Sequence, residues 1–217
     1  MNRILFTVAT IIIFAITCLA QSQSQELPKF EVAAEFTTLE RDSFIDNRTE
    51  PGFGGRFTFN LNRVVSLETA GYFFPKRCFS CRDNGRITEV LGGVKIGKRF
   101  ENWGIFAKAR PGIVSFSEGD FNIIPAPPPA DPAFPFTFEI NRTTNFATDV
   151  GAVLEFYPSK RIVTRFDAGD TIIHFNSRTR NVVQFIQSTN SFLVLPLNVP
   201  SRTTHSFQFM ASVGFRF

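Results

Sequence analysis

The sequence has 217 residues, 43% hydrophobic and 19% charged, a balance that fits one domain with a core and neither a helical membrane protein nor a disordered chain. The formal net charge of +4 comes without any run of Lys and Arg, which argues against a nucleic-acid partner. Phenylalanine dominates the aromatic residues, with 28 against 2 Tyr and 1 Trp, so the placement of these rings is the first pattern to explain.

Residues 1–20 predict a signal peptide that is cleaved on export. Arg3 supplies a positive n-region, residues 4–16 supply an apolar h-region, and small residues precede the cleavage site. A single membrane anchor and a lipoprotein modified at Cys18 are the alternatives. The apolar run is short for an anchor, and the residues before the cysteine match a lipobox poorly. Residues 21–29 then form a short polar leader.

The domain from 30 to 217 divides into eight segments in which apolar and polar residues alternate with the period of a β-strand. We predict strands at 30–39, 53–61, 64–73, 87–96, 103–112, 145–157, 162–175 and 205–217. At a tilt of about 45°, ten strand residues rise about 23 Å, which is close to the apolar band of an outer-membrane barrel. No later segment is apolar for the length of a membrane helix, so we expect strands to cross the membrane. The alternation breaks at 169–171, where we expect a bulge or the rim of the strand.

The last predicted strand shows the alternation most clearly. Phe207, Phe209 and Val213 fall on one parity, whereas Gln208 and Ser212 fall on the other. One face is therefore an apolar ribbon that ends in an aromatic residue, as in a strand that meets lipid and an aromatic girdle. We expect this strand to close a transmembrane barrel.

The connections between the predicted strands alternate between short and long. Those after strands two, four and six are short, and those after strands one, three, five and seven are long, as in barrels with short periplasmic turns and long outer loops. The third long loop contains a proline-rich stretch at 124–132, which predicts a stiff, solvated excursion or a recognition segment. The fourth has apolar alternation at 182–186 and 192–195, which predicts a hairpin beyond the membrane.

Alternation alone does not say which face looks outward, since a secreted lipocalin has the opposite arrangement. Aromatic residues near the predicted strand ends favour a lipid-facing girdle. These are Phe36, Phe53, Phe73, Trp103, Phe156 and Phe217.

The opposite parity carries charges of both signs. They are Arg56, Glu68, Glu89, Lys95, Lys108, Arg110, Asp149, Glu155, Arg165, Asp167 and Arg216. An eight-stranded barrel is just filled by its own side chains, so we expect these groups to form cross-strand pairs inside it. Interior packing is the prediction, and an ion path is the alternative.

Two cysteines, Cys78 and Cys81, remain after cleavage of the signal peptide. In an exported chain this pair predicts a local disulfide. Zinc is the alternative, but it needs four ligands, and neither His174 nor His205 is near in sequence. We expect no metal and no cofactor.

The whole mature chain resembles the small outer-membrane β-barrel family that includes the OmpA transmembrane domain. The terminal Phe217, with Phe215 and Val213 before it, is similar to the signal by which the outer-membrane assembly machinery recognises its clients. The resemblance implies an all-β, eight-stranded antiparallel up-and-down barrel with four long outer loops in the cell outer membrane. It also implies outer-membrane lipids, the assembly machinery and periplasmic chaperones as partners. The chain departs from the family in lacking a periplasmic domain after the barrel, so no cell-wall tether is expected.

The fold does not fix the function. We expect a structural or surface-interaction role, with an extracellular ligand bound through the long loops, and no enzymatic activity. An outer-membrane enzyme acting on lipid A is the alternative, because His205 and Ser206 lie near Asp170 and His174 at the outer ends of the last two strands. His205 and Ser206 are adjacent in sequence, however, and should point to opposite faces.

Overall fold

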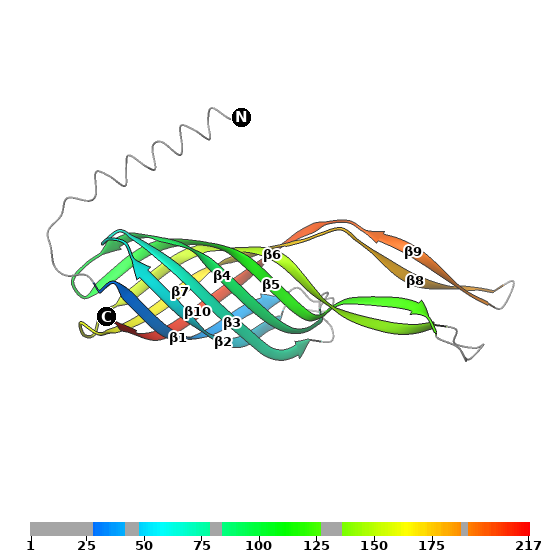
Figure 1. The fold of residues 1–217 in the computed structure, drawn as a ribbon, viewed down its shortest axis with the longest axis horizontal. Helices are drawn as coiled ribbons and strands as arrows, with labels where there is room; N and C mark the ends of the chain where they lie inside the picture. The colour runs from blue at the N-terminus through cyan, green and yellow to red at the C-terminus, as the bar shows by residue number, and fades with distance from the viewer. Residues whose placement is uncertain (1–27, 42–47, 79–83, 127–135, 188–190) are drawn as a thin grey trace, which may run out of the picture.

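The computed structural model describes residues 28–41, 48–78, 84–126, 136–187 and 191–217. These ranges contain ten strands (Figure 1). They are β1 (Phe30–Arg41), β2 (Arg48–Asn60), β3 (Val65–Cys78), β4 (Asn84–Arg99), β5 (Trp103–Pro125), β6 (Phe136–Phe156), β7 (Ile162–Phe175), β8 (Arg178–Ile186), β9 (Ser191–Val199) and β10 (Arg202–Arg216).

Eight of the strands form a closed antiparallel barrel in the order β1-β10-β7-β6-β5-β4-β3-β2, and β8 and β9 form a separate two-stranded sheet. The first and last strands close the ring, since Phe30 and Phe217 exchange backbone N–H···O bonds of 2.9 Å in both directions. Closure pairs every wall strand on both sides, which is what a sheet needs when its backbone leaves water. The predicted fold class, an eight-stranded antiparallel up-and-down barrel, is confirmed.

Alternation along each strand separates two very different faces. In β10, Phe207 is 55% exposed, and its neighbour Gln208 is fully buried inside the barrel. The strands are rich in aromatic and β-branched residues, which pack well on a pleated surface. Apolar side chains thus cover the outside of the wall, and the inside holds polar and charged side chains together with a buried apolar cluster.

The strands run further beyond the membrane than the sequence pattern predicts. β5 continues to Pro125 and β6 begins at Phe136, so the described parts of the third long loop are mostly a two-stranded extension and not an irregular excursion. The fourth loop contains the predicted hairpin, but β8 and β9 form their own sheet and do not prolong β7 and β10. Figure 1 shows both hairpins projecting from the same end of the barrel.

The break in alternation at 169–171 predicts a bulge or the rim of the strand. The bulge is wrong, because β7 keeps an unbroken register with both neighbours there, and the strand continues to Phe175. Gly169 lies opposite Gly151, and the polar Asp170 that interrupts the pattern simply faces outward. The register shifts lie instead on β3, β4 and β5, near the outer rim.

In the described ranges no helix has both the length and the apolar composition to cross a membrane. The predicted signal peptide at 1–20, nearly all of the leader, Cys81 and most of the proline-rich stretch lie outside the described residues. The signal peptide and the Cys78–Cys81 disulfide therefore stay predictions.

Candidate functional site

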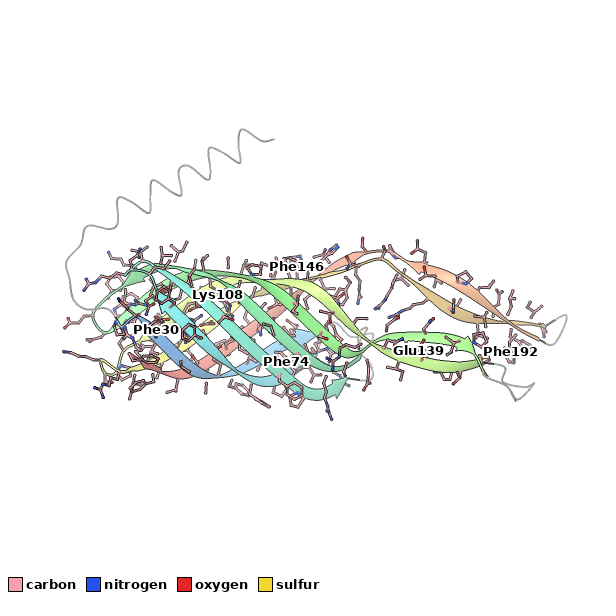
Figure 2. All side chains as sticks on the ribbon, in the orientation of Figure 1. Phe30, Phe74, Lys108, Glu139, Phe146 and Phe192 are labelled. Atoms are coloured by element: carbon pink, nitrogen blue, oxygen red, sulfur yellow. The ribbon has the colours of Figure 1, made fainter. Side chains whose placement is uncertain are left out.

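Aromatic rings form rows on the outer wall at the end of the barrel where its first and last residues lie. Phe30 lies 5.9 Å from Phe57 and 5.8 Å from Phe217 between ring centroids, and Phe100 stacks on Trp103 at 4.2 Å. Figure 2 shows Phe30 at this end of the barrel and Phe192 far away at the opposite end of the molecule. Rows of rings at the ends of the strands are the girdles of a lipid-spanning barrel.

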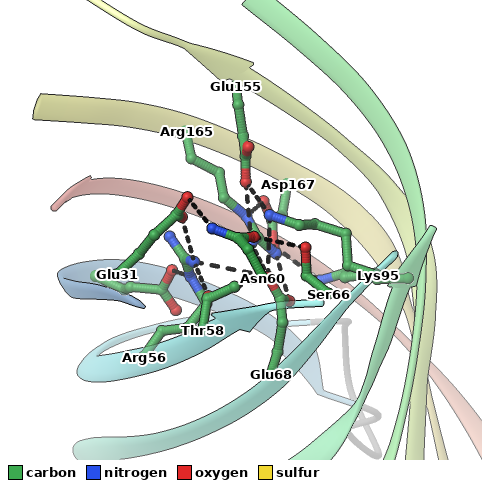
Figure 3. Close-up of polar contacts among 12 residues, drawn as sticks. Glu31, Arg56, Thr58, Asn60, Ser66, Glu68, Lys95, Glu155, Arg165 and Asp167 are labelled. Carbon is green, nitrogen blue, oxygen red and sulfur yellow. Dashed lines mark hydrogen bonds and ion pairs between the residues drawn. The ribbon is translucent and has the colours of Figure 1, made fainter. Parts of the chain in front are cut away.

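The eleven charged residues predicted to face inward are all buried in the structure. They are Arg56, Glu68, Glu89, Lys95, Lys108, Arg110, Asp149, Glu155, Arg165, Asp167 and Arg216. Ten of them form ion pairs, which offset the cost of burying their charges, and Glu89 accepts a hydrogen bond from Gln208. The charges form two connected clusters, and Figure 3 shows the one around Glu68 and Arg165.

Arg165 is the centre of this first cluster. Its guanidinium binds Glu68 through two N–H···O bonds of 2.5 and 3.1 Å, and it binds Asp167 through two more of 2.5 and 2.7 Å. Lys95 bridges the same Glu68, at 3.3 Å, to Glu155. Two-pronged bonds between guanidinium and carboxylate are the strongest and most directional of the charged pairs.

A second cluster lies around Asp149. Arg110 donates to its carboxylate from Nε at 2.9 Å and from the terminal nitrogen at 2.6 Å, and Lys108 approaches it at 2.9 Å. Lys108 also reaches Asp167 at 3.2 Å, which joins the two clusters. Met210 packs its sulfur against Lys108 and Arg110 at 3.7 and 3.4 Å, so no wide channel separates the walls at this level.

Towards the end with the hairpins the lumen becomes mostly apolar, although the buried Glu89, Glu50 and Arg41 also lie there. Gln208 donates to Thr37 at 3.1 Å and to Glu89 at 3.0 Å. A buried apolar cluster (the apolar cap) lies around and beyond it, with Tyr72 and Met210 bordering the charged clusters. Its members are Leu39, Ala70, Tyr72, Phe74, Ile87, Leu91, Val114, Phe116, Ala147, Ile173, Phe175 and Met210. The described lumen is therefore filled mainly by ion pairs in one part and mainly by hydrocarbon in the other, an arrangement suited to a closed barrel.

The opposite mouth is closed by Tyr157, which follows β6. Its hydroxyl donates to Glu155 at 2.8 Å and accepts from Arg99 Nε at 2.9 Å, and Arg216 lies 4.3 Å above its ring. Burial, followed by the nearby Glu155 carboxylate, raises the pKa of Tyr157 above its ordinary value. The phenol therefore stays protonated and keeps donating to the carboxylate.

Several interior groups were missed by the sequence reasoning. Glu31 and Glu35 on β1 are buried and face Arg56, with Glu35 2.8 Å from its Nε, and Arg99 lies 3.8 Å from Glu31. The signal that identifies the two glutamates was present, since they share the parity opposite Val32. Arg99 was missed because the predicted strand ended before it.

The two projecting hairpins contact each other through polar side chains. Asp120 of β5 accepts from Arg180 Nε of β8 at 3.0 Å, and Arg180 also donates to the Gly119 carbonyl at 3.2 Å. Asn181 adds two bonds to β5, from its backbone N–H to Asn122 at 2.9 Å and from its side chain to a carbonyl at 3.0 Å. β8 and β5 are thus braced into a single extracellular unit.

This unit exposes apolar side chains to water. On the β5–β6 hairpin, Phe121 lies opposite Ile140, and Phe138 is the next β6 residue on the same face. The three are 44 to 56% exposed. The other face of the same hairpin is polar, with Asn122 opposite Glu139. β9 adds further exposed apolar residues, which are Leu193, Leu195 and Leu197.

The histidine considered for catalysis lies on the outer wall. His205 Nδ1 is 2.6 Å from the Asp170 carboxylate, which also accepts from the backbone N–H of Ser206 at 3.0 Å. The side chain of Ser206 is buried on the inner face, whereas His205 is exposed. His174 instead contacts Thr203 at 3.1 Å. The structure therefore brings His205 and Asp170 together on the outer face, places the serine hydroxyl on the inner face, and gives His174 a different partner, Thr203.

The three residues of the predicted assembly signal, Val213, Phe215 and Phe217, point outward and are about half exposed or more. They belong to the apolar belt of the barrel. Their recognition by the assembly machinery stays a prediction.

A closed eight-stranded barrel with an apolar exterior, aromatic end rows and a charge-paired interior is built for lipid outside and polar groups inside. The chain is therefore a transmembrane β-barrel of the outer-membrane type, located in the outer membrane. Lipids of that membrane surround its apolar face. The lipocalin arrangement predicted as an alternative is wrong, since the apolar face looks outward.

Solved structures with this architecture include other small outer-membrane barrels. The attachment invasion locus protein Ail of Yersinia pestis is 10% identical with a TM-score of 0.48, covering 88% of this chain and 99% of that one. Neisserial surface protein A is 11% identical with a TM-score of 0.49, covering 87% and 97%. The N-terminal barrel domain of Pseudomonas aeruginosa OprF is 11% identical with a TM-score of 0.43, covering 85% and 97%. No family model and no curated protein matches the sequence.

Proposed function

We propose that this protein is a closed structural barrel whose extracellular hairpins bind a protein partner at the cell surface. The observation that carries the proposal is the exposed apolar face of the β5–β6 hairpin, formed by Phe121, Phe138 and Ile140. Contiguous apolar surface that faces water marks interaction sites. Here it stands on strands that rise from a rigid barrel, the usual way of presenting a binding surface.

The form of the hairpins favours a partner with an apolar, extended segment. Residues 136–145 of β6 pair with β5 on one side, and their pairing with β7 begins only at Phe146, so one edge of the hairpin is open over this part of the described chain. An open strand edge offers backbone hydrogen bonds, and the apolar face beside it offers contacts for alternate side chains. The Arg180–Asp120 brace restrains the hairpin in part before binding and so lowers the entropy cost of association by a small amount.

A peptide library displayed on phage and panned against the mature protein in nanodiscs tests the proposal. We expect enriched apolar peptides that bind the wild type and lose binding to the triple variant Phe121→Ser, Phe138→Ser, Ile140→Ser. The control is Thr137→Ser, Glu139→Ser, Asn141→Ser on the polar face of the same hairpin, which should bind like the wild type. No enrichment over empty nanodiscs, or equal binding to the apolar-face variant, would contradict the proposal.

We also propose that the role is not enzymatic, and the placement of Ser206 supports this. A nucleophile activated by His205 must lie within hydrogen-bond reach of the ring, and the Ser206 hydroxyl faces the lumen while His205 faces out. The His205–Asp170 pair at 2.6 Å is the observation that favours the alternative, an enzyme acting on lipid A. Mass spectrometry of lipid A from cells with and without the protein separates the two, and a change in acyl chains would establish the alternative.

A further inference from the structure

Three rows of outward-facing side chains cross β4, β5 and β6 below the base of the β5–β6 hairpin. The first row is apolar and about half exposed, and consists of Val90, Ile113 and Phe146. The second row bears hydroxyl groups, on Thr88, Ser115 and Thr144. The third row holds Arg86, Ser117 and Arg142. Within two steps along the strands the wall thus changes from hydrocarbon to hydroxyl to cation, as the membrane does from acyl chain to headgroup.

A hollow of about 310 Å³ lies over the second and third rows. Its wall includes both guanidinium-bearing residues, Arg86 and Arg142, with Ser115 and Ser117 between them. Phe73 of β3 closes one side. The hollow therefore opens on the lipid-facing side of the barrel and not into the lumen.

The hollow has a net positive charge. Neither Arg86 nor Arg142 has a carboxylate partner in the described part of the chain. Glu118 is the acidic residue of its wall, and it already has another interaction. The other arginine clusters described above are neutralised by carboxylates. Arg86 and Arg142 differ from them because no carboxylate of the described chain pairs with either.

The backbone is shaped locally to place these groups. β3, β4 and β5 all shift register at this level, and bulges re-aim side chains at the rims of barrels. Gly85 on β4 has a φ of +88°, and a Cβ there would lie 2.3 Å from Ser117 Oγ. The same hydroxyl accepts the backbone N–H of Arg86 at 2.9 Å, so Arg86 and Ser117 are fixed side by side.

We propose that this hollow binds a phosphate group, held between the Arg86 and Arg142 guanidiniums, and that the phosphate belongs to the headgroup of an outer-leaflet lipid such as lipid A. Guanidinium groups bind phosphate through paired N–H···O bonds, and the serine hydroxyls of the wall can donate to the remaining oxygens. The apolar row directly below would contact the acyl chains of the same lipid. A free phosphate ion has no acyl chains and would make no contact with that apolar row.

Native mass spectrometry of the folded, mature protein in detergent, titrated with lipid A, tests the site. We expect the double variant Arg86→Gln, Arg142→Gln to retain lipid A at least about tenfold more weakly than the wild type, since each arginine near a membrane surface contributes to headgroup binding. Lys160→Gln, Arg161→Gln is the matched control, because it removes the same charge at the opposite end of the barrel. It should bind like the wild type. Heat-modifiable migration on gels verifies that each variant is folded.

Two further arms identify the source of the phosphate. Lipid A with its phosphates removed should bind the wild type as weakly as intact lipid A binds the double variant. Inorganic phosphate should bind the wild type much more weakly than lipid A does. Equal retention of lipid A by the double variant would overturn the site, and equally tight binding of inorganic phosphate would overturn the lipid assignment. These outcomes do not depend on the hairpin partner, which binds a different surface.

Discussion

Arg165 shows how a single residue can hold a charged lumen together. All three of its guanidinium nitrogens donate to two carboxylates, Glu68 and Asp167, and its side chain is 1% exposed. Such a group is stabilising only while its partners remain, because a buried charge without a partner is strongly destabilising. The contribution of Arg165 is therefore best measured by removing it and leaving both carboxylates in place.

We predict that Arg165→Met lowers the free energy of unfolding by about 3–5 kcal/mol, because Glu68 and Asp167 become buried carboxylates short of a cation. Arg216→Met should lower it by less than half as much. Arg216 lies at the mouth, and its partner Glu31 keeps Arg56 and Arg99 nearby. Urea unfolding in phospholipid vesicles, followed by the fluorescence of the single tryptophan, measures both changes. Equal losses for the two variants would contradict the central position of Arg165.

At the scale of elements, the hairpins are held together by far weaker contacts than the barrel strands. β8 meets β5 mainly through the side chains of Arg178, Arg180 and Asn181. The Arg180–Asp120 pair is about a quarter exposed to water. Exposed ion pairs contribute about 0–1 kcal/mol. The brace is therefore expected to be adjustable, whereas the barrel register is not.

We predict that Asp120→Asn speeds hydrogen exchange of the β8 amides by a few-fold, the effect of a loss of up to about 1 kcal/mol. The amides of β1 and β10 should be unchanged, because their ladder closes the barrel. Hydrogen–deuterium exchange of the protein in nanodiscs, followed by mass spectrometry, measures the exchange rates of both sets of amides. Faster exchange throughout the barrel, or none in β8, would show that the pair does not act as a local brace.

For the whole molecule, the filled lumen predicts the absence of a stable pore. The charged clusters and the apolar cap leave the interior occupied from the Tyr157 mouth to the Phe175 level. We expect the purified protein in planar bilayers to show no steady conductance at moderate voltage. The folded state of the protein is first verified by its migration on gels. Reproducible open channels formed by this folded protein would contradict the packing described above.

The period of two along the strands was sufficient to predict the fold and the inward face, because the side of a strand on which a residue lies depends on parity alone. It could not predict which charges meet. Arg165 and Glu68 are 97 residues apart and touch across the lumen, a contact that depends on the register of the four strand interfaces that separate β7 from β3 on either side of the ring. Arg86 and Arg142 were missed for a related reason, since they were assigned to loops. The strands there run on through register shifts that no local pattern reveals.

The central claim is that lipid contacts the apolar face of the barrel, and β10 in a bilayer tests it most directly. Single cysteines at 207–215, in a background with Cys78 and Cys81 replaced by serine, carry a spin label whose collisions with oxygen and with a water-soluble nickel complex are measured. We predict that oxygen accessibility peaks at the odd-numbered positions, which include Phe207, Phe209 and Val213, and is low at the even-numbered ones. Low accessibility to both reagents at the odd-numbered positions would place the apolar face in the lumen and contradict the account.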